Sequence, residues 1–302
     1  MIDGPLPTAL DAVTRYEAIQ PRLPTATFPS QSIHRAHLGE LVDEIDCFVL
    51  DGFGVLNIGD SAVPDAATRL TELREAGKQL RVLTNGATLP VTRTRAKYQR
   101  WGMDFELSEV VSSRDALAVE LQNHTHKCWG FAAIAESELT TLTPDAVLLD
   151  DDIVTYDRCD GFVLLGARDW TVQRQSLLAE SLTGKPRPVL VGNPDLVAPQ
   201  PGALSREPGL YAHDLMDREL AIPAFFGKPF DNAFALIRNT LDGIDPQRIA
   251  MVGDTLHTDI LGGAQAGWKT VLVTSHGLLK GQDVDQAIQR CGIVPDYIVP
   301  TT

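Results

Sequence analysis

Short apolar runs that end in polar residues alternate with amphipathic stretches along much of this 302-residue chain. The run CFVLD at 47–51 is typical of a fully buried parallel strand, and the run LRVLTN at 80–85 predicts a second strand. Between them the pattern predicts a helix that Pro64 opens and Gly77 closes, and a further helix is predicted at 93–101. This order predicts one β-α-β unit followed by a helix.

The same alternation returns near the C-terminal end of the chain. Helices are predicted at 232–241 and 259–266, and strands are predicted at 248–254 and 269–274. Strands that alternate with helices predict an α/β protein with a Rossmann-like, doubly wound parallel sheet.

The middle of the chain, at 113–225, shows the same alternation and is long enough for a core of its own. Its predicted strands lie at 127–134, 161–166 and 188–193. We therefore predict a Rossmann-like core, made of 31–112 and 226–302, that is interrupted by an inserted α/β cap domain. Residues 1–30 contain five prolines, so this segment is predicted to be a surface arm with at most a short helix around 10–19.

Composition narrows the class of protein. The chain has 26 Lys and Arg against 40 Asp and Glu, a formal net charge of −14, which disfavours binding to nucleic acid or to an anionic membrane. The first residues lack the pattern of a secretory signal, and no apolar run reaches the ~18 residues of a membrane span, so a cytoplasmic protein is expected. The four cysteines are widely spaced without a C-x-x-C pair, which predicts buried reduced thiols.

Parallel sheets of this type bind ligands at the carboxyl ends of their strands, and polar residues follow several of the predicted strands. The candidates are one carboxylate, a hydroxyl beside an amide, a lysine in a Gly/Pro turn and a pair of carboxylates: Asp51, Thr84, Asn85, Lys228, Asp254 and Asp259. Carboxylates suit Mg²⁺, and hydroxyl and amide groups suit phosphoryl oxygens. Singly, each has an ordinary structural explanation, and Asp259 in particular is placed to cap the helix that follows it.

Taken in order, these residues resemble the motifs of the haloacid-dehalogenase-like (HAD) hydrolase superfamily. The resemblance is to its class IIA capped group, which includes nitrophenylphosphatase-like and sugar-phosphatase-like proteins. It covers 45–274, with the cap inserted after the second motif, and VGNPD at 191–195 resembles the segment that ends the class IIA cap.

The resemblance implies a Mg²⁺-dependent phosphatase that acts on a small phosphorylated metabolite. Asp51 would be the nucleophile that forms an aspartyl-phosphate, Thr84 would hold the phosphoryl group and Lys228 would neutralise its charge. Asp254 would bind Mg²⁺ together with Asp51, with Asp259 completing the metal site.

The first motif departs from the family pattern. The family has Asp-x-Asp-Gly, whose second Asp is the general acid/base, whereas this chain reads DGFG at 51–54. The main-chain carbonyl of Phe53 still matches a metal ligand of the family, but the side chain cannot transfer a proton. Because a positioned general acid/base contributes typically ~10²–10⁴-fold in rate, alkyl phosphates are expected to be poor substrates.

Three hypotheses follow. The first, which we prefer, is a phosphatase-like hydrolase that is slow, limited to activated phosphates, or served by another group such as His257, although a loop histidine facing solvent is the simpler expectation. The second is a catalytically weakened protein that binds or senses a phosphorylated ligand. The third is phosphonate or halide cleavage, which is disfavoured by the setting of the cap lysines Lys127 and Lys185 and by the intact GDTLHTD motif at 253–259.

Substrate choice is expected to come from the cap, because the cap faces the active site in class IIA relatives. Asn85 and Asn193 are expected to contact the substrate, and Asn193 with Asp195 would help to close the site, although NPD is also an ordinary turn. The run DDD at 150–152 is expected to be a solvated turn. Class IIA caps often mediate dimers, so the resemblance implies a homodimer through the cap.

Overall fold

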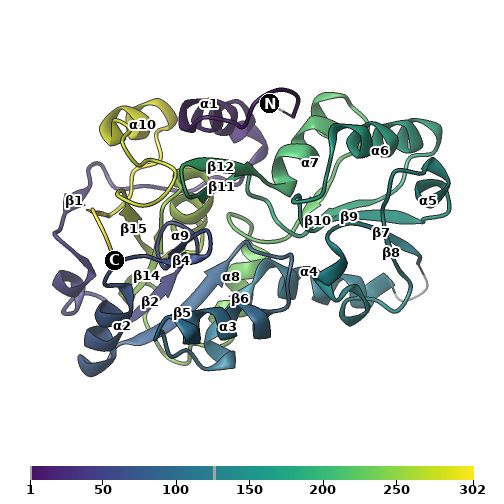
Figure 1. The fold of residues 1–302 in the computed structure, drawn as a ribbon. Helices are drawn as coiled ribbons and strands as arrows, with labels where there is room; N and C mark the ends of the chain where they lie inside the picture. Colours follow the sequence, from purple (N-terminus) through teal and green to yellow (C-terminus); the bar gives the residue numbers. More distant parts are fainter. Residues whose placement is uncertain (1, 125–126) are drawn as a thin grey trace.

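Two parallel sheets with helices packed on them lie side by side in the computed structural model, which describes residues 2–124 and 127–302 (Figure 1). The larger sheet has seven strands in the order β1-β16-β15-β14-β2-β5-β6, and every neighbouring pair is parallel. Its strands are β1 (Ile33–His34), β2 (Cys47–Leu50), β5 (Gln79–Thr84), β6 (Val110–Ser112), β14 (Ile249–Gly253), β15 (Lys269–Val273) and β16 (Tyr297–Val299). The predicted α/β fold with a doubly wound parallel sheet is confirmed.

The helices of the chain follow the predicted alternation with the strands. They are α1 (Ala9–Ile19), α2 (Ala66–Glu75), α3 (Val91–Arg100), α4 (Ser113–Leu121), α5 (Ile153–Asp157), α6 (Val172–Gly184), α7 (Pro208–Asp217), α8 (Asp231–Arg238), α9 (Leu261–Gln265) and α10 (Val284–Cys291). Both faces of the larger sheet are buried, because Phe48 and Leu50 of β2 pack in one apolar cluster with Leu73 of α2, whereas Val49 packs in a second cluster with Phe234 of α8. A run that is apolar at every position is therefore required at β2.

The smaller sheet lies within residues 129–225 and has five parallel strands in the order β13-β10-β9-β7-β8. Its strands are β7 (Trp129–Ala132), β8 (Ala146–Leu148), β9 (Gly161–Leu164), β10 (Val189–Val191) and β13 (Ala224–Phe225). Two antiparallel hairpins complete the strands: β3 (Asn57–Ile58) with β4 (Ser61–Ala62), and β11 (Val197–Gln200) with β12 (Ala203–Arg206). The hairpins meet where the amide of Gly59 donates to the carbonyl of Pro199 at 3.3 Å, so the second hairpin contacts the loop that follows β2.

The helix predicted to begin at Asp259 starts earlier in the structure. A π-helical turn covers Leu256–Ile260 and runs into α9, so Asp259 lies inside a helical turn and does not cap one. Its carboxylate instead accepts a hydrogen bond from the amide of Thr255 at 3.1 Å and lies 2.7 Å from the ammonium of Lys228. Single π-helical turns of this kind are frequent at functional sites.

The short helix predicted around 10–19 is observed as α1, which lies against the rest of the molecule with one face buried and the other exposed. Ala12, Tyr16 and Ile19 are buried there, at a spacing of four and three residues that places them on one face of the helix. They pack in one apolar cluster with residues of the cap and of the core, among them Leu210 and Leu278.

Three further expectations from the sequence concern membrane-spanning helices, the cysteines and the acidic run at 150–152. Among the described residues, no helix is long and apolar enough to cross a membrane. The four cysteines are free, and three of them are buried while Cys128 is half-buried. The acidic run at 150–152 is exposed, as expected of a solvated turn, and Asp152 caps α5.

A buried histidine joins α7 to the N-terminal segment. His213 stacks on Phe225 with ring centroids 5.1 Å apart, and its Nδ1 lies 3.5 Å from the guanidinium of Arg22. Burial, together with the charges of Arg15 and Arg22, lowers the pKa of His213 to about 3, and only Asp217 opposes this shift.

Because His213 is buried as a neutral ring, we expect the free energy of unfolding to fall in acid. Because the folded-state pKa lies below the unfolded value of 6.5, the neutral ring contributes stability that is present above pH 6.5 and lost as the pH falls toward 3. The free energy of unfolding is expected to drop by about 2 kcal/mol from this group between pH 7 and pH 5. Urea unfolding at the two pH values measures it, and His213→Gln should show a smaller drop. An unchanged drop in His213→Gln would contradict the assignment.

Candidate active site

The two central strands of the larger sheet end in the residues of the site. β2 and β14 are neighbours, and the later strands run outward from them in opposite directions, β5 and β6 on one side and β15 and β16 on the other. Ligands of such sheets bind at the carboxyl ends of the strands where the order reverses. Asp51 follows β2 and Asp254 follows β14, so both lie at that point.

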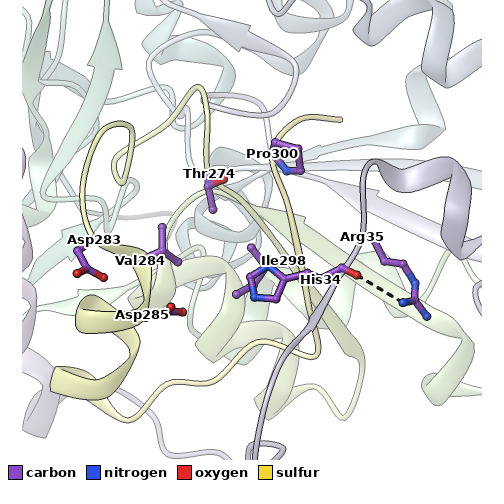
Figure 2. Close-up of a pocket in the computed structure, with 8 residues that line it drawn as sticks. All are labelled: His34, Arg35, Thr274, Asp283, Val284, Asp285, Ile298 and Pro300. Atoms are coloured by element: carbon purple, nitrogen blue, oxygen red, sulfur yellow. Dashed lines mark hydrogen bonds between the residues drawn. The ribbon is translucent and has the colours of Figure 1, made fainter.

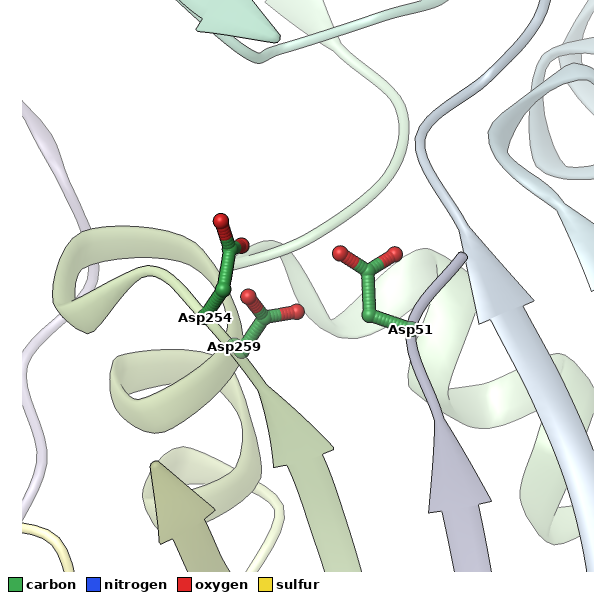
Figure 3. Close-up of side chains that lie close together, drawn as sticks. All are labelled: Asp51, Asp254 and Asp259. Atoms are coloured by element: carbon green, nitrogen blue, oxygen red, sulfur yellow. The ribbon is translucent and has the colours of Figure 1, made fainter. Parts of the chain in front are cut away.

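Three carboxylates converge at this edge of the sheet (Figure 3). One oxygen from each of Asp51, Asp254 and Asp259 lies within 4.8 Å of the others, and all three side chains are buried. Oxygen ligands in this number suit a hard divalent cation such as Mg²⁺, since carboxylates with main-chain carbonyls and water are its usual ligands in proteins. The side chains predicted to bind the metal are therefore brought together.

Asp254 is held by its neighbours on three sides. Its Oδ2 accepts from the amide of Leu278 at 2.7 Å, and its Oδ1 accepts from the hydroxyl of Thr255 at 3.0 Å. The loop after β2 passes so close that a Cβ on Gly54, which has a φ of +80°, would lie 2.6 Å from the Asp254 carboxyl carbon. Glycine is required there for both the conformation and the approach. The amide of Leu278 leaves no signature in side-chain patterns, so the sequence analysis missed it.

Lys228 occupies the centre of the acidic cluster. Its ammonium lies 2.5 Å from Oδ1 of Asp51 and 2.7 Å from Oδ1 of Asp259, and only 1% of its side chain is exposed. Burial by itself would lower the pKa of Lys228, but Asp259, Asp51 and Asp195 raise it above its usual value, so the lysine is charged. A turn lysine that could have been solvated is thus an internal counter-ion.

The carboxylates outnumber this single cation. Burial raises the pKa of Asp51 to about 8, against the attraction of Lys228, and burial together with Asp259 raises the pKa of Asp254 to about 7. Both shifts reflect negative charge that is removed from water without a matching positive charge. A divalent cation would neutralise this surplus, so the electrostatics of the site fit a metal as well as its donor atoms do.

Thr84 and Asn85 follow the neighbouring strand β5. The hydroxyl of Thr84 accepts from the amide of Gly86 at 3.1 Å and lies beside Gly52, where an added Cβ would be 3.2 Å away. Thr84 thus lies next to the loop that follows Asp51. The amide of Asn85 is used within the protein, since it donates to Asp195 at 2.8 Å and accepts from the backbone of Lys228 at 2.8 Å.

Asn193 and Asp195 lie in the segment that leaves the smaller sheet. The side chain of Asn193 accepts from the amide of Asp195 at 3.0 Å and donates to Glu207 at 3.1 Å, so it shapes a turn. The carboxylate of Asp195 instead accepts a hydrogen bond from the side chain of Asn85, which also donates to the main-chain carbonyl of Lys228. Asp195 is therefore a fourth carboxylate whose charge acts on Lys228. Substrate contact by Asn85 and by Asn193 stays a prediction.

Phe53 lies two residues after Asp51, at the position where the resemblance implies a general acid/base. Its ring is half-buried and lies against the ammonium of Lys97 of α3, which is 5.1 Å from the ring centroid and 5.2 Å from the ring of Trp101. Such cation–π contacts stabilise the ring beside α3. Lys97 is not indicated by the sequence, because the contact joins Phe53 to a separate element, α3.

The expectation that His257 faces solvent is wrong, and so is its recruitment as a proton donor from this position. Its ring is buried and stacked on Tyr16, with centroids 5.2 Å apart, and its Nε2 lies 3.3 Å from the side-chain oxygen of Gln20. Burial lowers the pKa of His257 to about 4. The histidine therefore faces α1 as a neutral ring.

A separate cavity of about 300 Å³ lies at the β1 edge of the larger sheet (Figure 2). His34 and Arg35 line it on one side, and Asp283 and Asp285 of the α10 region line it on the other. It shares no lining residue with the carboxylate cluster.

Comparisons with known proteins agree with this geometry. A haloacid dehalogenase-like hydrolase family model matches 48–142, and a HAD-hydrolase-like family model matches 225–301. Dihydroxyacetone phosphatase of Corynebacterium glutamicum is 26% identical over 253 residues, which are 83% of this chain and 87% of the relative. The 4-nitrophenylphosphatase of Schizosaccharomyces pombe is 25% identical over 281 residues, which are 86% of this chain and 93% of the relative.

A solved structure shares the fold over most of the chain. It is that of a possible sugar phosphatase of the HAD superfamily from Cytophaga hutchinsonii, with a TM-score of 0.76 and 23% identity, covering 89% of this chain and 98% of that chain. The resemblance to the haloacid-dehalogenase-like hydrolases is therefore confirmed by two family models, one in each half of the chain. The nitrophenylphosphatase and the possible sugar phosphatase that it matches are of the kind expected from the resemblance to the class IIA capped group.

Proposed function

We propose that this protein is a Mg²⁺-dependent phosphatase of small phosphorylated metabolites that works through an aspartyl-phosphate on Asp51. The observation that carries the proposal is the state of the Asp51 carboxylate. Its Oδ1 accepts from the amide of Gly52 at 2.6 Å and lies against Lys228 at 2.5 Å. Among the described residues, none makes a hydrogen bond to Oδ2, which leaves that oxygen to act as the nucleophile.

The reaction then has two steps. Oδ2 of Asp51 attacks phosphorus, the bond to the leaving oxygen breaks, and the phosphoryl group becomes a mixed anhydride with the carboxylate. Water next attacks the same phosphorus and releases inorganic phosphate and the free carboxylate. Lys228 offsets the charge of the phosphoryl oxygens in both steps, and the hydroxyl of Thr84 is placed to donate to one of them.

Asp51 and Asp254 would hold Mg²⁺, with the main-chain oxygen of Phe53 and with Asp259 as support. When bound, the cation neutralises the phosphoryl oxygens so that a carboxylate can approach them. Leu278 and Thr255 keep the Asp254 carboxylate oriented for this purpose through their hydrogen bonds.

The substrate class follows from the absence of a proton donor at position 53. A leaving group that needs no protonation, as in an acyl phosphate, is favoured over an alkyl phosphate. Neither cap lysine supports phosphonate cleavage, because the ammonium of Lys127 lies 5.9 Å from the ring of Trp129 and Lys185 is exposed.

Phosphate release measured with Mg²⁺ and acetyl phosphate or p-nitrophenyl phosphate tests the proposal. We expect turnover by the wild type that is lost on addition of a chelator and in Asp51→Asn, which keeps the size of the side chain but removes the nucleophilic carboxylate. Trapping of a phosphorylated wild-type protein, absent in Asp51→Asn, would support the covalent step.

A different pattern would support a binding protein. In that case Mg²⁺ and a phosphate analogue such as vanadate would raise the melting temperature, while neither turnover nor phosphorylated protein would exceed the Asp51→Asn control across a broad substrate panel. That pattern would overturn the enzymatic proposal.

A further inference from the structure

Helix α1 of the N-terminal segment lies between α10 of the core and α7 beside the smaller sheet (Figure 1). Arg15 and Arg22 contact Asp217 of α7 at 2.5 and 2.7 Å, and Glu17 contacts Arg290 of α10 at 2.6 Å. The helix is therefore tied by ion pairs to both parts of the molecule.

Tyr16 is the residue of α1 that reaches the active site. Its ring is buried and lies parallel to that of His257, with centroids 5.2 Å apart and planes 12° apart. Gln20, one turn further on, meets Nε2 of the same histidine at 3.3 Å. Because His257 belongs to the π-helical turn that carries Asp259, Tyr16 contacts the turn that supplies a carboxylate to the proposed metal site.

The hydroxyl of Tyr16 contacts the segment between β10 and β11. The hydroxyl accepts a hydrogen bond from the amide of Leu196 at 3.1 Å. Leu196 follows Asp195, whose carboxylate accepts a hydrogen bond from the side chain of Asn85. The same Asn85 side chain also donates to the main-chain carbonyl of Lys228. Tyr16 also shares an apolar cluster with Leu278, whose amide orients Asp254. The side chain of Tyr16 thus packs against three segments around the site, those of His257, Leu196 and Leu278.

We propose that Tyr16 is a positioning residue of the active site, which fixes the His257 turn through its ring and the Leu196 segment through its hydroxyl. The proposal deepens the proposed function, since it concerns the same site. The two contacts are separable, because Tyr16→Phe removes only the hydroxyl, whereas Tyr16→Ala removes the ring as well. The amide of Leu196 is left without its acceptor in both variants.

Hydrogen exchange of the full-length protein tests the two contacts without relying on activity. In Tyr16→Phe we expect exchange of the Leu196 amide to accelerate by about fivefold or more, as the loss of one buried hydrogen bond predicts, while the Leu278 amide stays protected. In Tyr16→Ala both amides should exchange faster. Mn²⁺ affinity, followed by its EPR signal, should fall about tenfold in Tyr16→Ala and much less in Tyr16→Phe, as for other groups that support metal ligands.

Tyr297→Phe is the matched control. Its hydroxyl also makes a partly buried hydrogen bond, which it donates to Glu44 at 2.5 Å, but Tyr297 lies in β16, near the edge of the larger sheet. The control should leave exchange of both amides and Mn²⁺ affinity at wild-type values. Equal effects in Tyr297→Phe, which would indicate general destabilisation, or wild-type exchange and Mn²⁺ affinity in Tyr16→Ala, would overturn the proposal.

If the wild type is active, steady-state kinetics provide a second test of the positioning role of Tyr16. Tyr16→Ala is expected to raise the Mg²⁺ concentration for half-maximal rate about tenfold, whereas KM for p-nitrophenyl phosphate changes little. An inactive wild type would contradict the proposed function but not the positioning role, because the exchange and Mn²⁺ measurements decide the latter by themselves.

Discussion

Phe53→Asp is expected to raise the hydrolysis of alkyl phosphates by about 10²–10⁴-fold, the contribution of a positioned general acid/base. The physical reason is that the variant carboxyl can protonate the leaving oxygen and then take a proton from the attacking water. The gain should be smallest for acetyl phosphate and p-nitrophenyl phosphate, whose leaving groups need little protonation. A series of phosphates with leaving groups of rising pKa measures this, and the rate should depend less steeply on that pKa in Phe53→Asp than in the wild type.

Lys97 affects how the introduced carboxyl titrates. Its ammonium lies 5.1 Å from the present ring of Phe53, so it would stabilise the ionised form of an aspartate there. The gain should therefore be largest at the acid end of the pH profile, where the carboxyl is protonated for the first step. Phe53→Asn is the matched control, because it has the same shape without a titratable proton. Equal gains in the two variants would show that space at position 53, and not proton transfer, limits the wild type.

The fold could be predicted because its information is local. The run at β2 is apolar at each position and is followed by Asp51, and the run at β14 is followed by Asp254. The type of each strand and the residue at which it ends can therefore be predicted from a few neighbouring residues. Parallel pairing then brings the two strand ends together, and with them the two carboxylates. The alternation of strands and helices thus places Asp51 and Asp254 at the same edge of the sheet, and the pairing of β2 with β14 brings them together.

The remaining parts of the site could not be predicted because they depend on contacts between distant segments. Tyr16 bonds to the amide of Leu196 across 180 residues, and no pattern near either residue indicates the partner. The same limit explains the error at His257, whose burial is caused by α1 and not by its own loop. Asp259 resembled a helix cap because its attraction to Lys228 is visible only in three dimensions.

Lys228→Met is expected to have the second large effect, on stability as well as on activity. The substitution leaves Asp51 and Asp259 buried without their shared counter-ion, which typically costs about 3–5 kcal/mol of unfolding free energy. It also removes the charge that faces the phosphoryl oxygens, so the rate should fall by about 10²–10³-fold. Mg²⁺ should restore part of the stability but not the rate, because a cation bound only by the folded state stabilises it by mass action.

The pH dependence separates this effect from ordinary loss of packing. The pKa of Asp51 already lies above its unfolded value, at about 8, and removal of Lys228 takes away an interaction that lowers it. Stability from such a raised carboxyl is present below about pH 4 and is lost as the pH rises toward the folded-state pKa. Lys228→Met should therefore lose more stability relative to wild type at pH 8 than at pH 5, as measured by urea unfolding in the presence of a chelator. Lys269→Met is the control, because it breaks a partly exposed ion pair with Asp296 and should cost only about 0–1 kcal/mol at either pH. A loss of stability in Lys228→Met that is equally small, or that does not depend on pH, would show that the carboxylates do not depend on this lysine.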